Sequence, residues 1–136
     1  MALPPAAAAA TKRFNPYALK LSGRVPPWST LHHRGRRSAR SYATPVMAFA
    51  ARRPGERDVL VVHPLPWGAD VDWCRNIRAA GSYELTRKNV EYRVDRLEVV
   101  DAEEIAPLLH GLPRAALSSG RFDQVLVGRV RRIAGT

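Results

Sequence analysis

Apolar and polar residues alternate on both sides of a two-residue break in the second half of the chain, and this pattern constrains the fold most strongly. The first alternating run covers residues 83–87 and the second covers residues 90–94. A period of two is typical of strands with one buried face, and the break, Lys88-Asn89, has the length of a tight hairpin turn. The pattern predicts a β-hairpin whose second strand continues through Leu97 and Val99.

Three further stretches with strand-like composition precede this hairpin. Turn-forming residues separate them, with Gly35 and Ser38 in the first link and Pro54-Gly55 in the second. The unbroken apolar run at residues 59–62 favours a strand buried on both faces, which we place centrally in the sheet. We therefore expect a β-meander made of residues 28–34, 42–51 and 59–63.

Two segments before the hairpin have the spacing of amphipathic helices, residues 14–21 and residues 70–80. Asp70 is a candidate N-cap of the second helix and Gly81 is its candidate C-cap. Its expected buried face carries Trp73, Ile77 and Ala80.

Two more helices are predicted towards the C-terminus. Asp101 and Glu104 form the Asp-x-x-Glu pattern of a capping box, and a loop around Pro113 is expected to end the helix that follows. A last helix is predicted over residues 122–133, where apolar residues recur at three- and four-residue spacing. Its apolar face consists of Phe122, Val125, Leu126, Val130 and Ile133.

Length and composition bound the architecture. A chain of 136 residues with 46% hydrophobic and 25% charged residues fits one globular domain. We expect a disordered alanine and proline tail over residues 1–12 and a single domain over residues 13–136. Because alternating βα units are absent, the expected fold is mainly β with flanking helices (α+β), a small antiparallel β-barrel.

The sequence also limits the surroundings of the protein. The longest stretch without a charged residue, Ser41–Ala51, is about half of the roughly 20 residues that a membrane-spanning helix needs. The alanines of residues 6–10 supply too little apolar area for a firm membrane anchor. The single cysteine, Cys74, permits no internal disulfide and agrees with a reducing compartment, so a cytoplasmic location is expected.

A strongly basic charge balance suggests an anionic partner. The chain carries 22 Lys+Arg residues against 12 Asp+Glu, a net charge of +10, and nearly all the cations are arginines. The planar guanidinium suits phosphate and carboxylate better than a lysine ammonium does. A GC-rich genome would enrich arginine in the same way, so both explanations stay open. The basic residues are spread along the chain without interleaved aromatics, and we therefore expect no nucleic-acid partner.

The densest basic feature is the predicted turn over residues 34–41, which carries four arginines, two serines and a glycine. Arginines bind phosphate through charge-assisted hydrogen bonds, and a tight turn can add backbone N–H groups. The turn is a candidate phosphate site, and a solvated basic hairpin tip is the alternative. The strand that follows contains Pro45, which lacks a ladder donor and favours a sheet edge. Free backbone groups at such an edge could bind the rim of a flat heterocycle, although a plain strand-entry proline fits as well.

Histidine and cysteine spacing gives no metal site, and we predict none. His32 and His33 are adjacent in a strand and should point to opposite faces, while His63 and Cys74 lie on separate elements. No Walker loop, Gly-x-Ser-x-Gly or Gly-x-Gly-x-x-Gly motif is present. Trp73 lies close to the start of the predicted helix over residues 70–80, where it fits either core packing or a flat ligand surface.

Together these segments resemble the deazaflavin-dependent nitroreductase family, split-barrel oxidoreductases of actinobacteria. The resemblance covers about residues 15–100 and depends on motifs that occur in the order of the family. They are Asn15-Pro16, Leu31-His32-His33-Arg34-Gly35-Arg36-Arg37-Ser38, Thr44-Pro45-Val46, Gly68-Ala69-Asp70, Asp72-Trp73 and Arg75-Asn76-Ile77-Arg78-Ala79. Many members carry glycine at the position of Ala39. The C-terminal tyrosines of some members have no counterpart, because the last tyrosine is Tyr92, and the resemblance identifies no catalytic proton donor.

The resemblance implies a split β-barrel that binds the 8-hydroxy-5-deazaflavin coenzyme F420, with FMN as the alternative cofactor. Three groups of residues carry over as cofactor-binding residues. They are Arg36, Arg37, Ser38 and Arg40 at the phosphate, Tyr42, Ala43, Thr44, Pro45 and Val46 along the deazaflavin, and Trp73 and Asn76 beside its ring.

The implied reaction is hydride transfer from the reduced coenzyme to an electron-poor small molecule, such as an activated alkene, a quinone or a nitro compound. The alternative function is a non-catalytic binder or carrier of a flavin-like or lipid-like ligand on the same fold. We favour a monomer over a homodimer.

Overall fold

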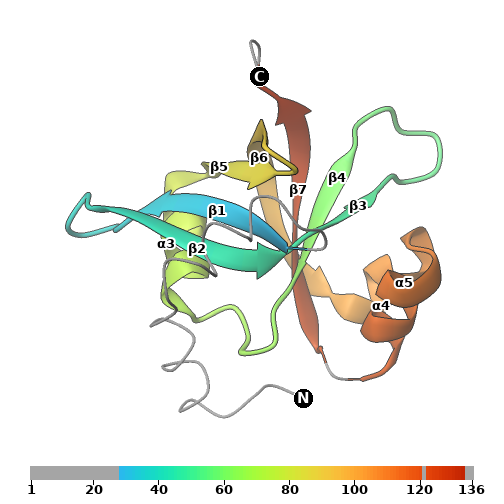
Figure 1. The fold of residues 1–136 in the computed structure, drawn as a ribbon. Coiled ribbons are helices and arrows are strands. Elements are labelled where there is room, and N and C mark those ends of the chain that lie inside the picture. Colours follow the sequence, from blue (N-terminus) through green and yellow to red (C-terminus); the bar gives the residue numbers. More distant parts are fainter. Residues whose placement is uncertain (1–27, 121, 134–136) are drawn as a thin grey trace.

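The computed structural model describes residues 28–120 and 122–133, so the predicted tail over residues 1–12 and the predicted helix over residues 14–21 lie outside the described residues. The described chain contains seven strands, three α-helices and one 3-10 helix (Figure 1). In chain order these are β1 (Trp28–Arg34), β2 (Ser41–Met47), β3 (Phe49–Ala51), β4 (Leu60–Pro64), α3 (Asp72–Ala80), β5 (Ser82–Arg87), β6 (Val90–Asp101), α4 (Ala102–Ile105), η1 (Ala106–Leu108), α5 (Gly111–Ser118) and β7 (Gln124–Arg132).

All seven strands form one antiparallel sheet in the order β2-β1-β5-β6-β7-β4-β3. The two edge strands, β2 and β3, are separated in the chain only by Ala48, which is buried. A flat sheet would hold its two edges far apart, so the sheet must curl until they meet at Ala48 (Figure 1). The result is a half-barrel, and the predicted α+β fold with a split β-barrel is confirmed. The predicted strand over residues 42–51 is one extended stretch that breaks at this corner.

The predicted hairpin is confirmed in detail. β5 and β6 pair around Lys88 and Asn89, whose φ angles of 50° and 62° are those of a type I′ turn. β6 then continues past a bulge between Asp95 and Glu98, which lets this long strand bend along β7.

Helix α3 covers one face of the half-barrel and contacts β1 and β5. It begins at Asp72 with Val71 as its N-cap, so the prediction of Asp70 as the cap is wrong, whereas Gly81 ends the helix with a φ of 82° as predicted. Its buried residues are Cys74, Asn76 and Ile77. The expected buried face of Trp73, Ile77 and Ala80 is corrected, because Ala80 is exposed and Trp73 is only half-buried. Of the three, only Ile77 lies fully inside the core.

The buried hydrophobic residues form two clusters, one of which joins α4, η1 and α5 to strands β3, β4 and β7 through residues such as Ile105, Leu117 and Val125. Asp101 is the N-cap residue of α4, but its side chain makes no capping hydrogen bond, so the predicted capping box does not form. Pro113 lies within the first turn of α5 and does not end a helix. Proline is tolerated there because the first N–H groups of a helix have no partner within the helix.

The predicted helix over residues 122–133 is wrong, because residues 124–132 form β7, a strand with β6 on one side and β4 on the other. Its run from Val125 to Gly128 is buried on both faces of the sheet. A strand covered on both faces is apolar throughout, so its apolar residues can match a helical spacing by coincidence. The β-branched valines were the signal that favoured a strand.

Gly128 marks the closest approach between β7 and β6. A Cβ atom at this position would collide with Val94 Cγ1 and would lie 3.1 Å from the backbone oxygen of Asp95. We expect Gly128→Ala to lower the free energy of unfolding by about 1 to 3 kcal/mol, because a packed core resists an added methyl group. Urea denaturation measures this loss, and an unchanged midpoint would contradict the close approach of the two strands.

Candidate functional site

The basic turn, residues 35–40 between β1 and β2, is closed by its own hydrogen bonds. The Gly35 N–H donates to Arg40 O and the Ala39 N–H donates to Gly35 O, each over 2.9 Å. The Arg40 N–H donates to Ser38 Oγ over 3.2 Å. A Cβ atom at Gly35 would collide with that Ser38 hydroxyl, so a larger residue there would force the hydroxyl to move away from the Arg40 N–H. Ala39 has a φ of 57°, a left-handed conformation that favours glycine.

Arg36 is directed towards helix α3. Asn76 Oδ1 accepts two hydrogen bonds from this residue, one from the backbone N–H over 3.2 Å and one from Nη1 over 2.8 Å. Asp72 Oδ1 lies 4.0 Å from the same Nη1. Asn76 is only 5% exposed, so this link between the turn and the helix is sheltered from water.

His33 continues the same network towards β2. Both Arg36 groups are donors, which assigns Oδ1 to that side of Asn76, so the Asn76 amide donates from Nδ2 to His33 Nδ1 over 3.1 Å. His33 Nε2 therefore carries the ring proton and donates it to Thr44 Oγ1 over 3.0 Å. The imidazole also stacks on Tyr42, with ring centroids 5.4 Å apart. Burial lowers the pKa of His33 to about 4, so the ring is neutral at pH 7.

Arg37 and Arg40 are placed differently from Arg36. Both are exposed, and within the described chain no side-chain hydrogen bond or ion pair engages them. Ser38 is also exposed, and its hydroxyl proton stays available because its oxygen acts as the acceptor for Arg40 N–H. Of the four residues predicted at the phosphate, these three can meet a ligand directly, whereas Arg36 is bound to the protein itself.

The predicted residues of β2 divide between the two faces of the sheet. Tyr42 and Thr44 contact His33 on the α3 side, and Val46 is buried in the core on that side. Alternation along a strand places Ala43 and Pro45 on the opposite face. The register with β1 directs the backbone nitrogens of these two residues away from β1, towards an edge that no described strand covers. The prediction that Pro45 lies on an edge strand is confirmed.

Trp73 packs against the core beneath α3 and meets the His63 ring edge-on at 6.2 Å. His63 is fully buried, donates from Nδ1 to Met47 O over 2.8 Å and accepts from the Tyr83 hydroxyl over 2.5 Å. Burial lowers the pKa of His63 to about 4 and raises that of Tyr83 well above its usual range. Trp73 is therefore half-buried, and its contact with this buried pair belongs to the core.

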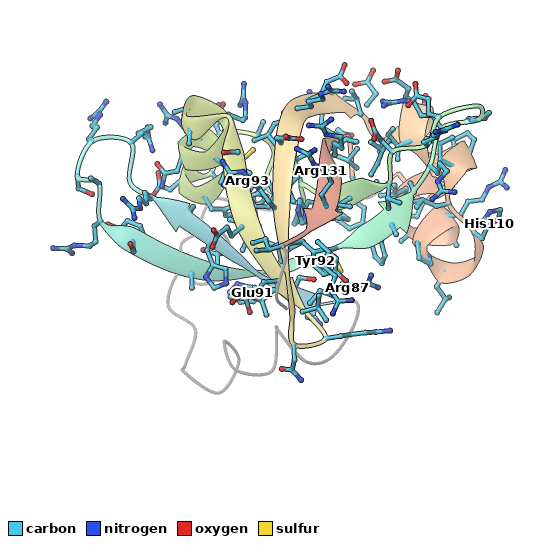
Figure 2. All side chains as sticks on the ribbon, turned by 90° about the horizontal axis from the view of Figure 1, so that it is seen from above. Arg87, Glu91, Tyr92, Arg93, His110 and Arg131 are labelled. Carbon is cyan, nitrogen blue, oxygen red and sulfur yellow. The ribbon has the colours of Figure 1, made fainter. Side chains whose placement is uncertain are left out.

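Other arginines lie on the outer face of the sheet, where Arg93 of β6 stands opposite Arg131 of β7 (Figure 2). Asp95 accepts hydrogen bonds there from Arg129 over 2.8 and 2.9 Å and from Arg131 over 3.2 Å. The Arg129 hydrogen bonds lower the pKa of Asp95. Part of the basic excess is therefore used in ion pairs of the sheet, away from the basic turn.

Sequence reasoning missed the connecting residues of the site. His33 links α3 to β2, and Asp72 approaches Arg36, yet neither was predicted as a site residue. The adjacent histidines were an available signal, because one of two neighbours in a strand must face the covered side. His32 indeed points the other way, to Thr86.

Three further features bear on the choice of function. Within residues 28–120 and 122–133, no cluster of three or more His, Cys, Asp or Glu residues is arranged to hold a metal ion. None of the helices in the described chain has the length and apolar character needed to cross a membrane. A shallow cavity of about 200 Å³ lies between α4 and α5, lined by Glu103, Ala106, Pro107, Arg114 and Ser118, and it shares no residue with the basic turn.

Comparison with models of known protein families gives no match for this chain, and neither does comparison with curated proteins.

Proposed function

We propose that the protein binds a reduced deazaflavin coenzyme and transfers hydride to an electron-poor small molecule, such as an activated alkene, a quinone or a nitro compound. The observation that carries the proposal is the basic turn. It presents Arg37, Ser38 and Arg40 to solvent, and its conformation is closed by hydrogen bonds within the protein. A site formed in advance loses less free energy on binding than one that must be ordered.

The residues of the turn fit a phosphate-bearing cofactor. Two guanidinium groups and one hydroxyl can each donate to phosphate oxygens. The left-handed conformation of Ala39 lies where many members of the nitroreductase family have glycine, which supports the resemblance. The edge of β2, which no strand of the described residues covers, begins directly after the turn, so an extended ligand anchored by its phosphate could continue along Ala43 and Pro45.

The coenzyme would supply the hydride, and the chain would supply position and charge. Arg37 and Arg40 would hold the phosphate. Neutral His33 would keep the Thr44 hydroxyl oriented through their hydrogen bond, while Tyr42 would keep the imidazole in place. We propose further that the protein is a split-barrel oxidoreductase and that it acts in the cytoplasm as a monomer.

A fluorescence titration with oxidised coenzyme F420 tests this function, run beside FMN at two salt concentrations. We expect saturable micromolar binding of the deazaflavin that weakens at high salt, followed by oxidation of the reduced coenzyme when an acceptor such as menadione is added. Tighter binding of FMN would change the cofactor assignment. Binding without turnover of any acceptor would favour a carrier, and binding of neither cofactor would overturn the proposal.

A further inference from the structure

We propose that Asn76 is a positioning residue that sets the shape of the basic turn through Arg36, and that His33 holds the Asn76 amide in the required orientation. The proposal concerns how the phosphate site is built, so its affinity readout rests on the proposed function, while its second readout needs no ligand. The family resemblance implies that Asn76 lies beside the cofactor ring, and the role proposed here differs from that one.

The hydrogen bonds of the Asn76 side chain are made to other residues of the protein. One oxygen accepts from both the backbone and the guanidinium of Arg36, and the amide nitrogen donates to His33. Arg37 follows Arg36 directly and Arg40 lies in the same turn, so fixing the Arg36 backbone fixes where the two exposed arginines begin. Asn76 lies on a regular helix that packs on β1 and β5. Its hydrogen bonds therefore hold the turn in a fixed position relative to the sheet and the helix.

The amide orientation depends on a neutral His33. Only an unprotonated Nδ1 can accept the Asn76 N–H; a protonated ring would face it with a second donor. The amide would then rotate and present its own donors to the donors of Arg36. Besides Asn76, the groups around this imidazole are Asp72 of α3, His32 of β1, and Tyr42 and Thr44 of β2. Arg36 of the turn contacts Asn76 and approaches Asp72.

Asn76→Asp tests the network without any ligand. The carboxylate keeps two acceptor oxygens for Arg36 but faces His33 Nδ1 with an acceptor, which favours the protonated ring. We expect NMR titration of the His33 imidazole to show a pKa higher by about 1 to 3 than in the wild type. His33→Gln identifies the resonance, and Ala79→Asp adds the same charge on an exposed position of α3 as the control. A His33 pKa that moves no more in Asn76→Asp than in Ala79→Asp would overturn the network.

A thermodynamic cycle tests the path through Arg36. Arg36→Ala and Asn76→Ala should each weaken coenzyme F420 binding about fivefold, and the double variant should bind no more weakly than the worse single variant. The backbone amide resonances of Arg37 and Arg40 should shift in the same pattern in all three variants. The positioning role would be overturned if the affinity losses of the two single variants multiplied in the double variant and the amide shifts of Arg37 and Arg40 differed among the three variants. If the wild type binds no coenzyme, the proposed function fails, but the amide shifts and the His33 titration still decide this inference.

Discussion

Lowering the pH from 6.5 to 4.5 is expected to reduce the free energy of unfolding by about 2 kcal/mol through His63 alone, because this ring must stay neutral in the folded protein. The ring is fully buried, with Met47 O accepting its one proton and the Tyr83 hydroxyl occupying its other nitrogen. Burial holds the pKa of His63 at about 4, below the 6.5 of a free histidine. Over this pH range His63 therefore becomes protonated in the unfolded chain but stays largely neutral in the folded chain, so the free energy of unfolding falls as the pH falls.

Urea denaturation at several pH values measures this loss, and the interval lies above the range in which Asp95 titrates. The stabilising ion pair at Asp95 is lost only at lower pH, because the pKa of that carboxyl is lowered below its ordinary 3.8 by Arg129. Half-buried His33 adds to the loss in the same direction. His63→Leu should make the slope between pH 6.5 and 4.5 clearly shallower by removing the His63 share of about 2 kcal/mol, and the His33 share should remain. A variant with the wild-type slope would contradict the assignment to His63.

The sheet could be predicted from the sequence where a strand has one exposed face, and also at β4, where a short unbroken apolar run follows turn residues although every residue of the strand is buried. The hairpin of residues 83–94 alternates because β5 and β6 each have a covered and an exposed side, and its turn residues have the positive φ angles that the spacing requires. β7 has no wet face along its buried run, so its period was lost and a helix was predicted. The cause is tertiary, since only its neighbours β4 and β6 determine how much of it is covered.

The site could be predicted as a set of residues but not as a set of contacts. Arginines in a turn indicate anion binding from composition alone, and the turn has the expected closed form. The pairing of Arg36 with Asn76 joins residues forty positions apart, and no local pattern indicates it. This pairing holds Arg36, one of the residues expected at the phosphate, against the protein itself, so in the proposed function Arg37 and Arg40 would have to bind the phosphate.

Replacing both exposed arginines, Arg37→Ala with Arg40→Ala, is therefore expected to weaken binding of coenzyme F420 by about a hundredfold. Each charge-assisted contact with phosphate contributes about 1.5 kcal/mol or more, which corresponds to about tenfold in affinity. The fold should be unaffected, because both side chains are exposed and make no bond within the described chain. The fluorescence titration measures the affinity, and thermal unfolding checks the fold.

Loss of net charge alone would also weaken binding of an anion, so the matched control removes two exposed arginines elsewhere, Arg57→Ala with Arg114→Ala. Long-range attraction to these residues is screened beyond about 10 Å at 0.1 M salt. The control should therefore approach wild-type affinity as salt is added, whereas direct contacts persist at short range and their loss should remain. Equal losses in the two double variants at high salt would show that the turn contributes charge but no binding geometry. A difference that survives salt can arise only from contacts made at Arg37 and Arg40, the residues that Arg36 and Asn76 leave free.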